Sequence, residues 1–194
     1  MNRLLTGLLA VAILIGAGFW WTLRRLDPPV ETIVASSLES LHQQNRLAPF
    51  AARFVTAATS SKSQMGLSAE KTLIIPAMVR YEIDLAKLKQ DDLAWDAKAK
   101  TLHIVLPPIE LAGPEFDLGQ TREYESGMVL LTLTDVEKRL DAENRAKARA
   151  DILQQAKAGT MMRLAKEAGA RAVERSFAMP LAAAGVEAKV VVGW

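Results

Sequence analysis

The feature that most constrains this chain is a run of twenty uncharged residues from Leu4 to Leu23. At about 1.5 Å per residue, a helix of this length spans about 30 Å, which is the hydrocarbon thickness of a bilayer. Aromatic rings favour the headgroup layer and arginines stop a span, and both kinds of residue follow at its far end: Phe19, Trp20, Trp21, Arg24 and Arg25. The sequence therefore predicts a transmembrane anchor over residues 1–26, which contacts the lipid bilayer through residues 4–23.

A cleaved signal peptide is the alternative to this anchor. Gly16 and Gly18 would be the small residues before the cut, but the three aromatic residues that follow are a poor cleavage context. The positive charges on the two sides of the run are nearly balanced, so they give little information about orientation. The short tail before the run favours a signal-anchor, which would place the rest of the chain outside the cytoplasm.

Composition excludes several classes of protein and site. The 24 basic and 22 acidic residues leave a net charge of only +2, and the basic residues are spread along the chain, so no nucleic-acid partner is predicted. The absence of cysteine excludes disulfides, thiol catalysis and cysteine-based metal sites. About 165 residues remain after the anchor, which suits one domain over residues 27–194.

The first half of this domain predicts one helix followed by strands. Apolar residues at spacings of three and four predict an amphipathic helix over residues 30–44. Alternation predicts strands over 50–59 and 71–85, with the polar stretch 60–66 as the loop between them, and Pro76 indicates a bulge, an edge or a second strand segment. Residues 93–107 resemble a hairpin with its turn at 96–100.

The second half predicts a long, alanine-rich helical region. Residues 108–133 look irregular, with a short strand near 109–111. Thr134 and Glu137 form a capping-box pattern, which predicts the start of a helix. Two pairs with the favourable order of charge at a spacing of four support that helix: Glu143 with Lys147 and Asp141 with Arg145.

The end of the chain predicts a return to strand. Gly159 is expected to kink the helical region and Gly185 to end it, and residues 186–194 then predict a last strand that pairs back into the sheet. The expected fold class is α+β: an N-terminal transmembrane helix, a short helix, a mostly antiparallel sheet, a long helical region and a C-terminal strand.

Four aspartates within fourteen residues are the first candidates for a chemical site: Asp84, Asp91, Asp92 and Asp96. A calcium loop needs carboxylates at every second position around a glycine, and this stretch has neither feature. We interpret them as structural residues instead. Asp84 is expected to be the N-cap of a helical turn, Asp91 or Asp92 to cap or turn the next connection, and Asp96 to open the hairpin.

Ser68 and Lys71 are the second candidate, because they fit the S-x-x-K spacing of serine acylating enzymes. The other elements of those enzymes, S-D-N and K-T-G, do not occur in the chain. His103 lies between Leu102 and Ile104 and has no second ligand at a suitable spacing, so a structural histidine is expected. The sequence therefore assigns no catalytic, cofactor-binding or metal-binding residue, and an envelope hydrolase that uses a Ser68/Lys71 dyad stays as the alternative.

One segment carries a resemblance to a known family. The sequence VRYEIDLAKLKQDDLAWDAKAKTLHIVLPPIEL, residues 79–111, combines a strand, an Asp-Leu-x-x-Leu turn, a hairpin and a Leu-Pro-Pro exit. Together with the N-terminal anchor, the alanine-rich helical region and the strand after Gly185, it resembles a bacterial family catalogued as domain of unknown function 4230. No residue-by-residue match to the family is assigned for the Glu- and Gly-rich residues 113–127. The resemblance implies a single-pass anchor and an α+β domain that faces the periplasm, and it transfers no catalytic residue.

These observations predict a membrane-anchored, non-catalytic binding or scaffolding module of the bacterial cell envelope. Its expected location is the inner membrane, with the C-terminal domain in the periplasm. The expected partners are the bilayer and another envelope protein, and a homo-oligomer formed through the long helix is a further possibility.

Overall fold

The structure is a computed structural model that describes residues 13, 15–16, 29–64, 66–128, 131 and 135–194. The predicted membrane span lies outside these residues, apart from Ile13, Ile15 and Gly16. Among the described residues, no helix combines the length and the apolar character needed to cross a membrane.

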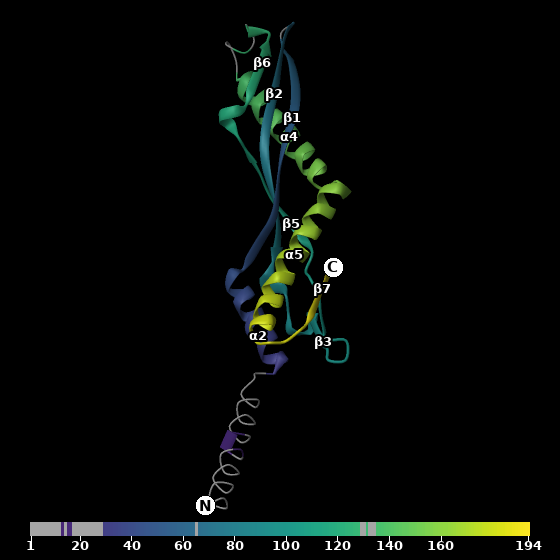
Figure 1. The fold of residues 1–194 in the computed structure, drawn as a ribbon. Coiled ribbons are helices and arrows are strands. Elements are labelled where there is room, and N and C mark those ends of the chain that lie inside the picture. The colour runs from purple at the N-terminus through teal and green to yellow at the C-terminus, as the bar shows by residue number, and fades with distance from the viewer. Residues whose placement is uncertain (1–12, 14, 17–28, 65, 129–130, 132–134) are drawn as a thin grey trace, which may run out of the picture.

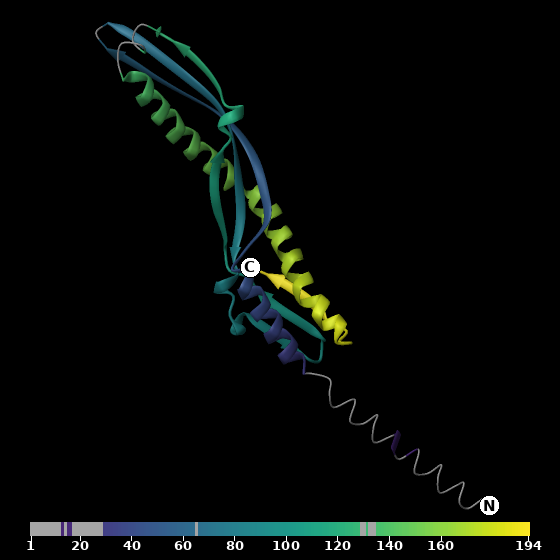
Figure 2. The ribbon, with the colours of Figure 1, turned by 90° about the vertical axis from the view of Figure 1, so that its left-hand side faces the viewer.

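The chain folds into a long hairpin with helices along it and a second, small sheet at one end (Figure 1). The elements, in chain order, are α2 (Val30–Gln44), β1 (Arg46–Gln64), β2 (Leu67–Asp84), η1 (Leu85–Lys87), η2 (Gln90–Asp92), β3 (Leu93–Asp96), β4 (Thr101–Val105), β5 (Ile109–Phe116), η3 (Leu118–Gln120), β6 (Arg122–Ser126), α4 (Val136–Ala156), α5 (Gly159–Ala183) and β7 (Lys189–Gly193). The turn between β1 and β2 lies at the opposite end of the molecule from α2, as both views show (Figure 2). We call these two ends the tip and the base. The α+β fold class is confirmed.

The β1–β2 hairpin sets the architecture. Its antiparallel register is unbroken from Phe50–Tyr81 at the base to Gln64–Leu67 at the tip. Successive side chains of a strand point to opposite faces, so one face of β2 carries the odd-numbered residues. These residues are buried from Ala69 to Ile83, and α4 and α5 follow one another along the hairpin to cover them.

The strands are longer than the sequence predicted. Residues 60–66 were expected to form a loop, but 60–64 continue β1 and pair with residues 67–71 of β2. Serine has a weak intrinsic preference for strands, yet pairing supplies cross-strand contacts such as Ser63 Oγ to Ser68 Oγ at 2.8 Å. The prediction of a loop was therefore wrong for residues 60–64, where tertiary pairing outweighed local preference, whereas Gly66 lies in the turn.

Pro76 lies in the middle of the central strand without interrupting it. β5 pairs with β2 from Ile83 as far as Ala77, and β6 pairs with β2 from Ile74 to Glu70. Pro76 therefore falls in the gap between the two outer strands, where its missing N–H leaves no neighbour unpaired, while its carbonyl accepts a bond from Asp117 N at 2.9 Å. The short strand predicted near 109–111 is confirmed as the start of β5. The prediction that the rest of residues 108–133 is irregular was wrong for the remainder of β5 and for β6.

The base holds the second sheet and the main core. The predicted hairpin 93–107 is present as β3 and β4, and the predicted C-terminal strand is β7, which pairs in parallel with β4. The core of the base joins α2, η1, β4, β7 and the end of α5. Its buried residues include Leu38, Leu41, Leu85, Ile104, Phe177 and Val190.

The predicted long helical region is two helices. α4 ends at Ala156 and α5 begins at Gly159, the position where a kink was expected. The fully buried Tyr81 donates a hydrogen bond to the carbonyl of Ala156 at 2.9 Å, which fixes this junction against β2. α5 ends before Gly185, whose φ of +74° suits glycine, as the sequence predicted. The predicted helix start at Thr134 lies outside the described residues.

Close packing of α5 on the sheet gives a testable contrast between two glycines. A Cβ on Gly169 would lie 2.7 Å from Ile83 Cδ1 and 3.3 Å from the Trp194 ring, whereas a Cβ on Gly159 would meet nothing within 4 Å. We expect Gly169→Ala to lower the free energy of unfolding by about 1–3 kcal/mol through overpacking. Gly159→Ala is the matched control and should leave it unchanged or raise it slightly. Urea denaturation of both variants measures the difference, and equal effects would contradict the packing described.

Candidate functional site

The structure does not bring Ser68 and Lys71 together as a dyad. The S-x-x-K spacing places both side chains on one face only if the segment is helical, but both residues belong to the strand β2. In a strand, residues three apart point to opposite faces. Ser68 is exposed and contacts Ser63, whereas Lys71 is buried on the helix-covered face.

Lys71 instead lies at the centre of an ionic cluster near the tip. Its ammonium, with only 1% of the side chain exposed, is surrounded by four carboxylates. β6 supplies Glu123 at 3.0 Å and Glu125 at 2.6 Å. α4 supplies Asp141 at 2.8 Å and Glu137 at 3.6 Å. We call these five residues the Lys71 cluster.

Local periodicity explains why these carboxylates converge. Glu123 and Glu125 are two residues apart on β6, so they share one face, and the register places Glu125 opposite Lys71. Glu137 and Asp141 are four residues apart on α4, so they lie one above the other on the side of the helix that faces β2. The cluster therefore ties together three elements that are distant in sequence.

The electrostatics of the cluster keep Lys71 cationic. Burial alone would lower its pKa, but hydrogen bonds with Asp141, Glu125 and Glu123 outweigh that effect and hold the pKa well above the usual value for lysine. A lysine in this state cannot take a proton from a nearby hydroxyl at neutral pH. The Lys71 ammonium can hold elements together, and it is unsuited to general-base chemistry.

Asn144 extends the cluster toward the backbone. It is fully buried on α4, and its Nδ2 donates to the carbonyl of Lys71 at 2.8 Å. Among the described residues, its Oδ1 has no hydrogen-bond partner, whereas Asp141 Oδ1 lies 2.8 Å from the Lys71 ammonium. The sequence did not predict this cluster. The alternating glutamates of β6 and the acidic residues on one side of α4 are evident in the local sequence, but their contact with Lys71 is not.

Three of the four aspartates, Asp91, Asp92 and Asp96, have the structural positions that the sequence predicted. Asp96 Oδ1 accepts hydrogen bonds from the N–H groups of Lys98 and Ala99, at 2.8 and 3.0 Å, and so closes the hairpin turn as predicted. These bonds, that of Ala99 first, lower the pKa of Asp96. Asp92 Oδ2 accepts from Lys89 N at 2.8 Å, which caps η2. Asp91 flanks it in the same turn.

The prediction that the Asp84 side chain caps a helical turn was wrong. Asp84 precedes the helical turn η1, but its side chain makes no capping hydrogen bond. The carboxylate instead lies 3.2 Å from Lys87 Nζ and 3.9 Å from Arg46 Nη2. Ion pairing has replaced capping, because two cations from neighbouring elements lie within reach.

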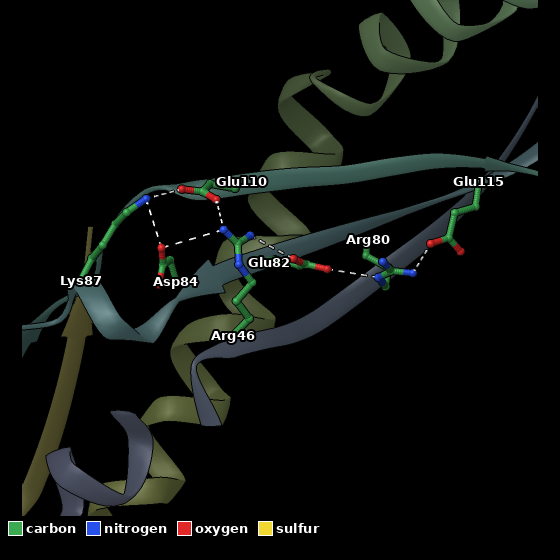
Figure 3. A network of polar contacts seen from close by, with 7 residues as sticks. All are labelled: Arg46, Arg80, Glu82, Asp84, Lys87, Glu110 and Glu115. Atoms are coloured by element: carbon green, nitrogen blue, oxygen red, sulfur yellow. Dashed lines mark hydrogen bonds and ion pairs between the residues drawn. The ribbon is translucent and has the colours of Figure 1, made fainter. Parts of the chain in front are cut away.

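Asp84 belongs to a second ionic network, which lies at the base (Figure 3). Its members on β2 have even numbers, so they lie on the face opposite to Lys71. Arg46 lies in its middle and contacts Glu82 at 3.2 Å and Glu110 at 3.0 Å. The network continues through Lys87 on one side and through Arg80 and Glu115 on the other. Three cations and four carboxylates thus join β1, β2, η1 and β5 in a solvent-facing ladder.

Neither network resembles a metal centre. In the described part of the chain, no three acidic or histidine side chains are grouped so that they could hold a metal ion. His103 is exposed on β4, in the strand position expected. The grooves between elements are open ones, such as that of about 420 Å³ between α2 and α5, which is lined by Ser37, Leu41, Arg175 and Met179 among others.

The base network predicts a pH-dependent contribution to stability. Lys87 first, and then Arg46, hold the pKa of Glu110 below its usual value. A depressed pKa means that the stabilising effect is present above the pKa of the unfolded chain and is lost as pH falls through the folded pKa. Glu110→Gln should therefore lower the urea midpoint of unfolding slightly at pH 7. The difference in midpoint between the variant and the wild type should disappear in acid, below about pH 4. A difference that stays constant with pH would contradict the ion pairing.

Comparison with known proteins agrees with the resemblance in residues 79–111. The model of a family described as protein of unknown function (DUF4230) matches residues 39–192, from the middle of α2 to the end of β7. Comparison with curated proteins and with solved structures gave no match. Because the family model covers most of the chain, the chain belongs to the family of proteins of unknown function DUF4230.

Proposed function

We propose that this chain is a membrane-anchored, non-catalytic binding or scaffolding module of the bacterial cell envelope. The observation that carries the proposal is the shape of the domain. The base begins at α2, directly after residues 1–28, and the hairpin runs from there to a tip at the other end. An anchor at residues 4–23 would hold the base near the inner membrane and leave the tip as the part farthest from it.

The length of the hairpin suits a module that reaches a partner. β1 has 19 residues, which at about 3.3 Å each extend over about 60 Å. The two proline residues before α2, Pro28 and Pro29, favour a stiff and extended exit from the anchor. With the domain in the periplasm, the tip would meet another envelope protein, which is the partner that we propose.

The described side chains favour binding over catalysis. Lys71 is held as a cation by four carboxylates, and Ser68 faces the other side of the strand, so the dyad needed for the alternative hydrolase has no geometric support. The base network also consists of charges paired with one another on the surface. Both networks fix elements in place, as a scaffold requires.

A topology measurement tests the location. A reporter enzyme that is active only outside the cytoplasm, fused after Trp194, should be active, and the fusion should sediment with inner membranes. The matched control carries the same reporter on a chain that lacks residues 1–26 and should be inactive and unattached. An inactive full-length fusion would overturn the periplasmic location.

A covalent probe for reactive serine tests the absence of catalysis. We expect the wild type to be labelled no more than Ser68→Ala or Ser63→Ala, because Ser68 lies on the face of β2 opposite to Lys71. Ser63→Ala is the matched control because Ser63 is the cross-strand neighbour of Ser68 and is also exposed. Labelling that is lost only in Ser68→Ala would reverse the proposal in favour of the hydrolase.

A further inference from the structure

We propose that β6 occupies a strand-acceptor site on the outer edge of β2, and that this site binds an extended segment of a partner with carboxylates at alternate positions. β6 itself is the model for that segment, with Glu123 and Glu125 at alternate positions against Lys71. The inference rests on the proposed binding function and gives it a site and a recognition chemistry.

The first step is the direction of the backbone groups of β2. The carbonyl of Pro76 accepts from Asp117 N at 2.9 Å, so the carbonyl of this residue points away from β1. Thr72 lies four residues before Pro76 on the same strand and points the same way, and the hydroxyl groups of Thr72 and its β1 partner Thr59 lie 2.8 Å apart, as a non-hydrogen-bonded pair allows. The N–H and C=O of Thr72 consequently point away from β1 and toward β6.

The same direction holds for every second residue of β2, because the register is unbroken. Glu70, Thr72 and Ile74 therefore present their backbone groups to β6, opposite Ser126, Tyr124 and Arg122. Without β6, these groups would form an open strand edge, and such an edge pairs readily with an extended segment.

The second step is the weak attachment of β6 itself. All five of its residues are exposed, whereas the neighbouring stretch of β2 is alternately buried. Among the described residues, no side chain of β6 belongs to an apolar core cluster. Five paired residues and two carboxylates on Lys71 hold the strand, and segments with so little buried apolar contact open at low free energy.

The third step is the charge of the acceptor. Lys71 remains on β2 when β6 leaves, and α4 still supplies Glu137 and Asp141 to it. The side of the ammonium that faced Glu123 and Glu125 would then lack its two partners. A buried cation favours a segment that restores them, so the acceptor selects carboxylates two residues apart and disfavours neutral strands.

Gly127 offers a way to open β6 without altering the charges. This residue follows β6 with φ +79°, and a Cβ on it would lie 2.1 Å from the carbonyl oxygen of Ser68 and 2.7 Å from Ala69 Cα. Gly127→Ala must therefore move the chain away from β2 at the end of β6. Gly119→Ala is the matched control, because its Cβ would meet only Asp117 Oδ1, at 3.6 Å.

Hydrogen exchange on the full chain in detergent tests whether β6 opens. In Gly127→Ala, the amides of Arg122, Tyr124 and Ser126 and those of Thr72 and Ile74 should exchange faster than in the wild type. The amides around Tyr81 and Ile83 should stay protected, which shows that the base remains folded. Gly119→Ala should match the wild type. Unchanged exchange of those three β6 amides in Gly127→Ala would overturn the proposed seating of β6.

Peptide binding to the opened chain tests the recognition chemistry. The probe is a fluorescent peptide with the sequence QTREYESGM, residues 120–128, and the comparison peptide has Gln at both Glu positions. Gly127→Ala should bind the probe, and the Gln peptide should bind at least about tenfold more weakly, which corresponds to about 1.4 kcal/mol. The double variant Gly127→Ala/Lys71→Met, which keeps the open edge but lacks the ammonium, should lose this preference.

Two results of the peptide experiment would overturn the acceptor site. One is equal binding of the two peptides to Gly127→Ala, which would show that Lys71 does not select carboxylates. The other is no binding of either peptide although hydrogen exchange shows β6 open. Loss of protection around Tyr81 and Ile83 in Gly127→Ala would equally count against β6 as a separately opening strand. The outcomes of these experiments do not depend on the reporter measurement of topology. A failure of this inference can therefore be told apart from a failure of the proposed location.

Discussion

The unbroken pairing of β1 with β2 is the constraint on which the rest of the structure depends. From Phe50–Tyr81 to Gln64–Leu67, no bulge changes the side to which a residue points. The odd-numbered residues of β2 are therefore fixed on the face that α4 and α5 cover. Most of these residues are apolar, such as Leu73, Ile75 and Val79, but the same rule also places Lys71 on the covered face. A lysine in that position needs carboxylates beside it, and β6 and α4 provide them.

Different interactions stabilise the two ends of the molecule. The base combines an extensive apolar core with a ladder of ion pairs on the opposite face of β2. The tip has a smaller cluster among the described residues, formed by Ala69, Leu131, Val136 and Leu140, beside the Lys71 cluster. Hydrophobic contacts are non-directional, whereas the ionic contacts at the tip need specific partners. The tip is therefore the end where an extended segment of a partner could take the place of β6.

The sequence predicted those elements whose signals are local. The spacing of apolar residues predicted α2, the alternation before Asp84 predicted β2, and Asp96 and Gly185 marked a turn and a helix end correctly. The start of β5 was predicted near residues 109–111, but residues 60–64, the rest of β5 and β6 were missed, because serine, glycine and glutamate have weak strand preferences and become strands only by pairing with β2. The candidate pair Ser68 and Lys71 failed for a related reason. Its spacing suits a helix, and the segment is a strand.

The central claim is that the buried Lys71 ammonium joins β6 to the hairpin, and a double-mutant cycle tests it most directly. The free energy of unfolding would be measured for the wild type, Lys71→Met, Glu125→Gln and the double variant. Glu125 is the carboxylate nearest to Lys71, at 2.6 Å. We predict a coupling energy of at least about 1.5 kcal/mol, the lower end of the range of hydrogen bonds to charged groups. Additive effects of the two substitutions would contradict the account.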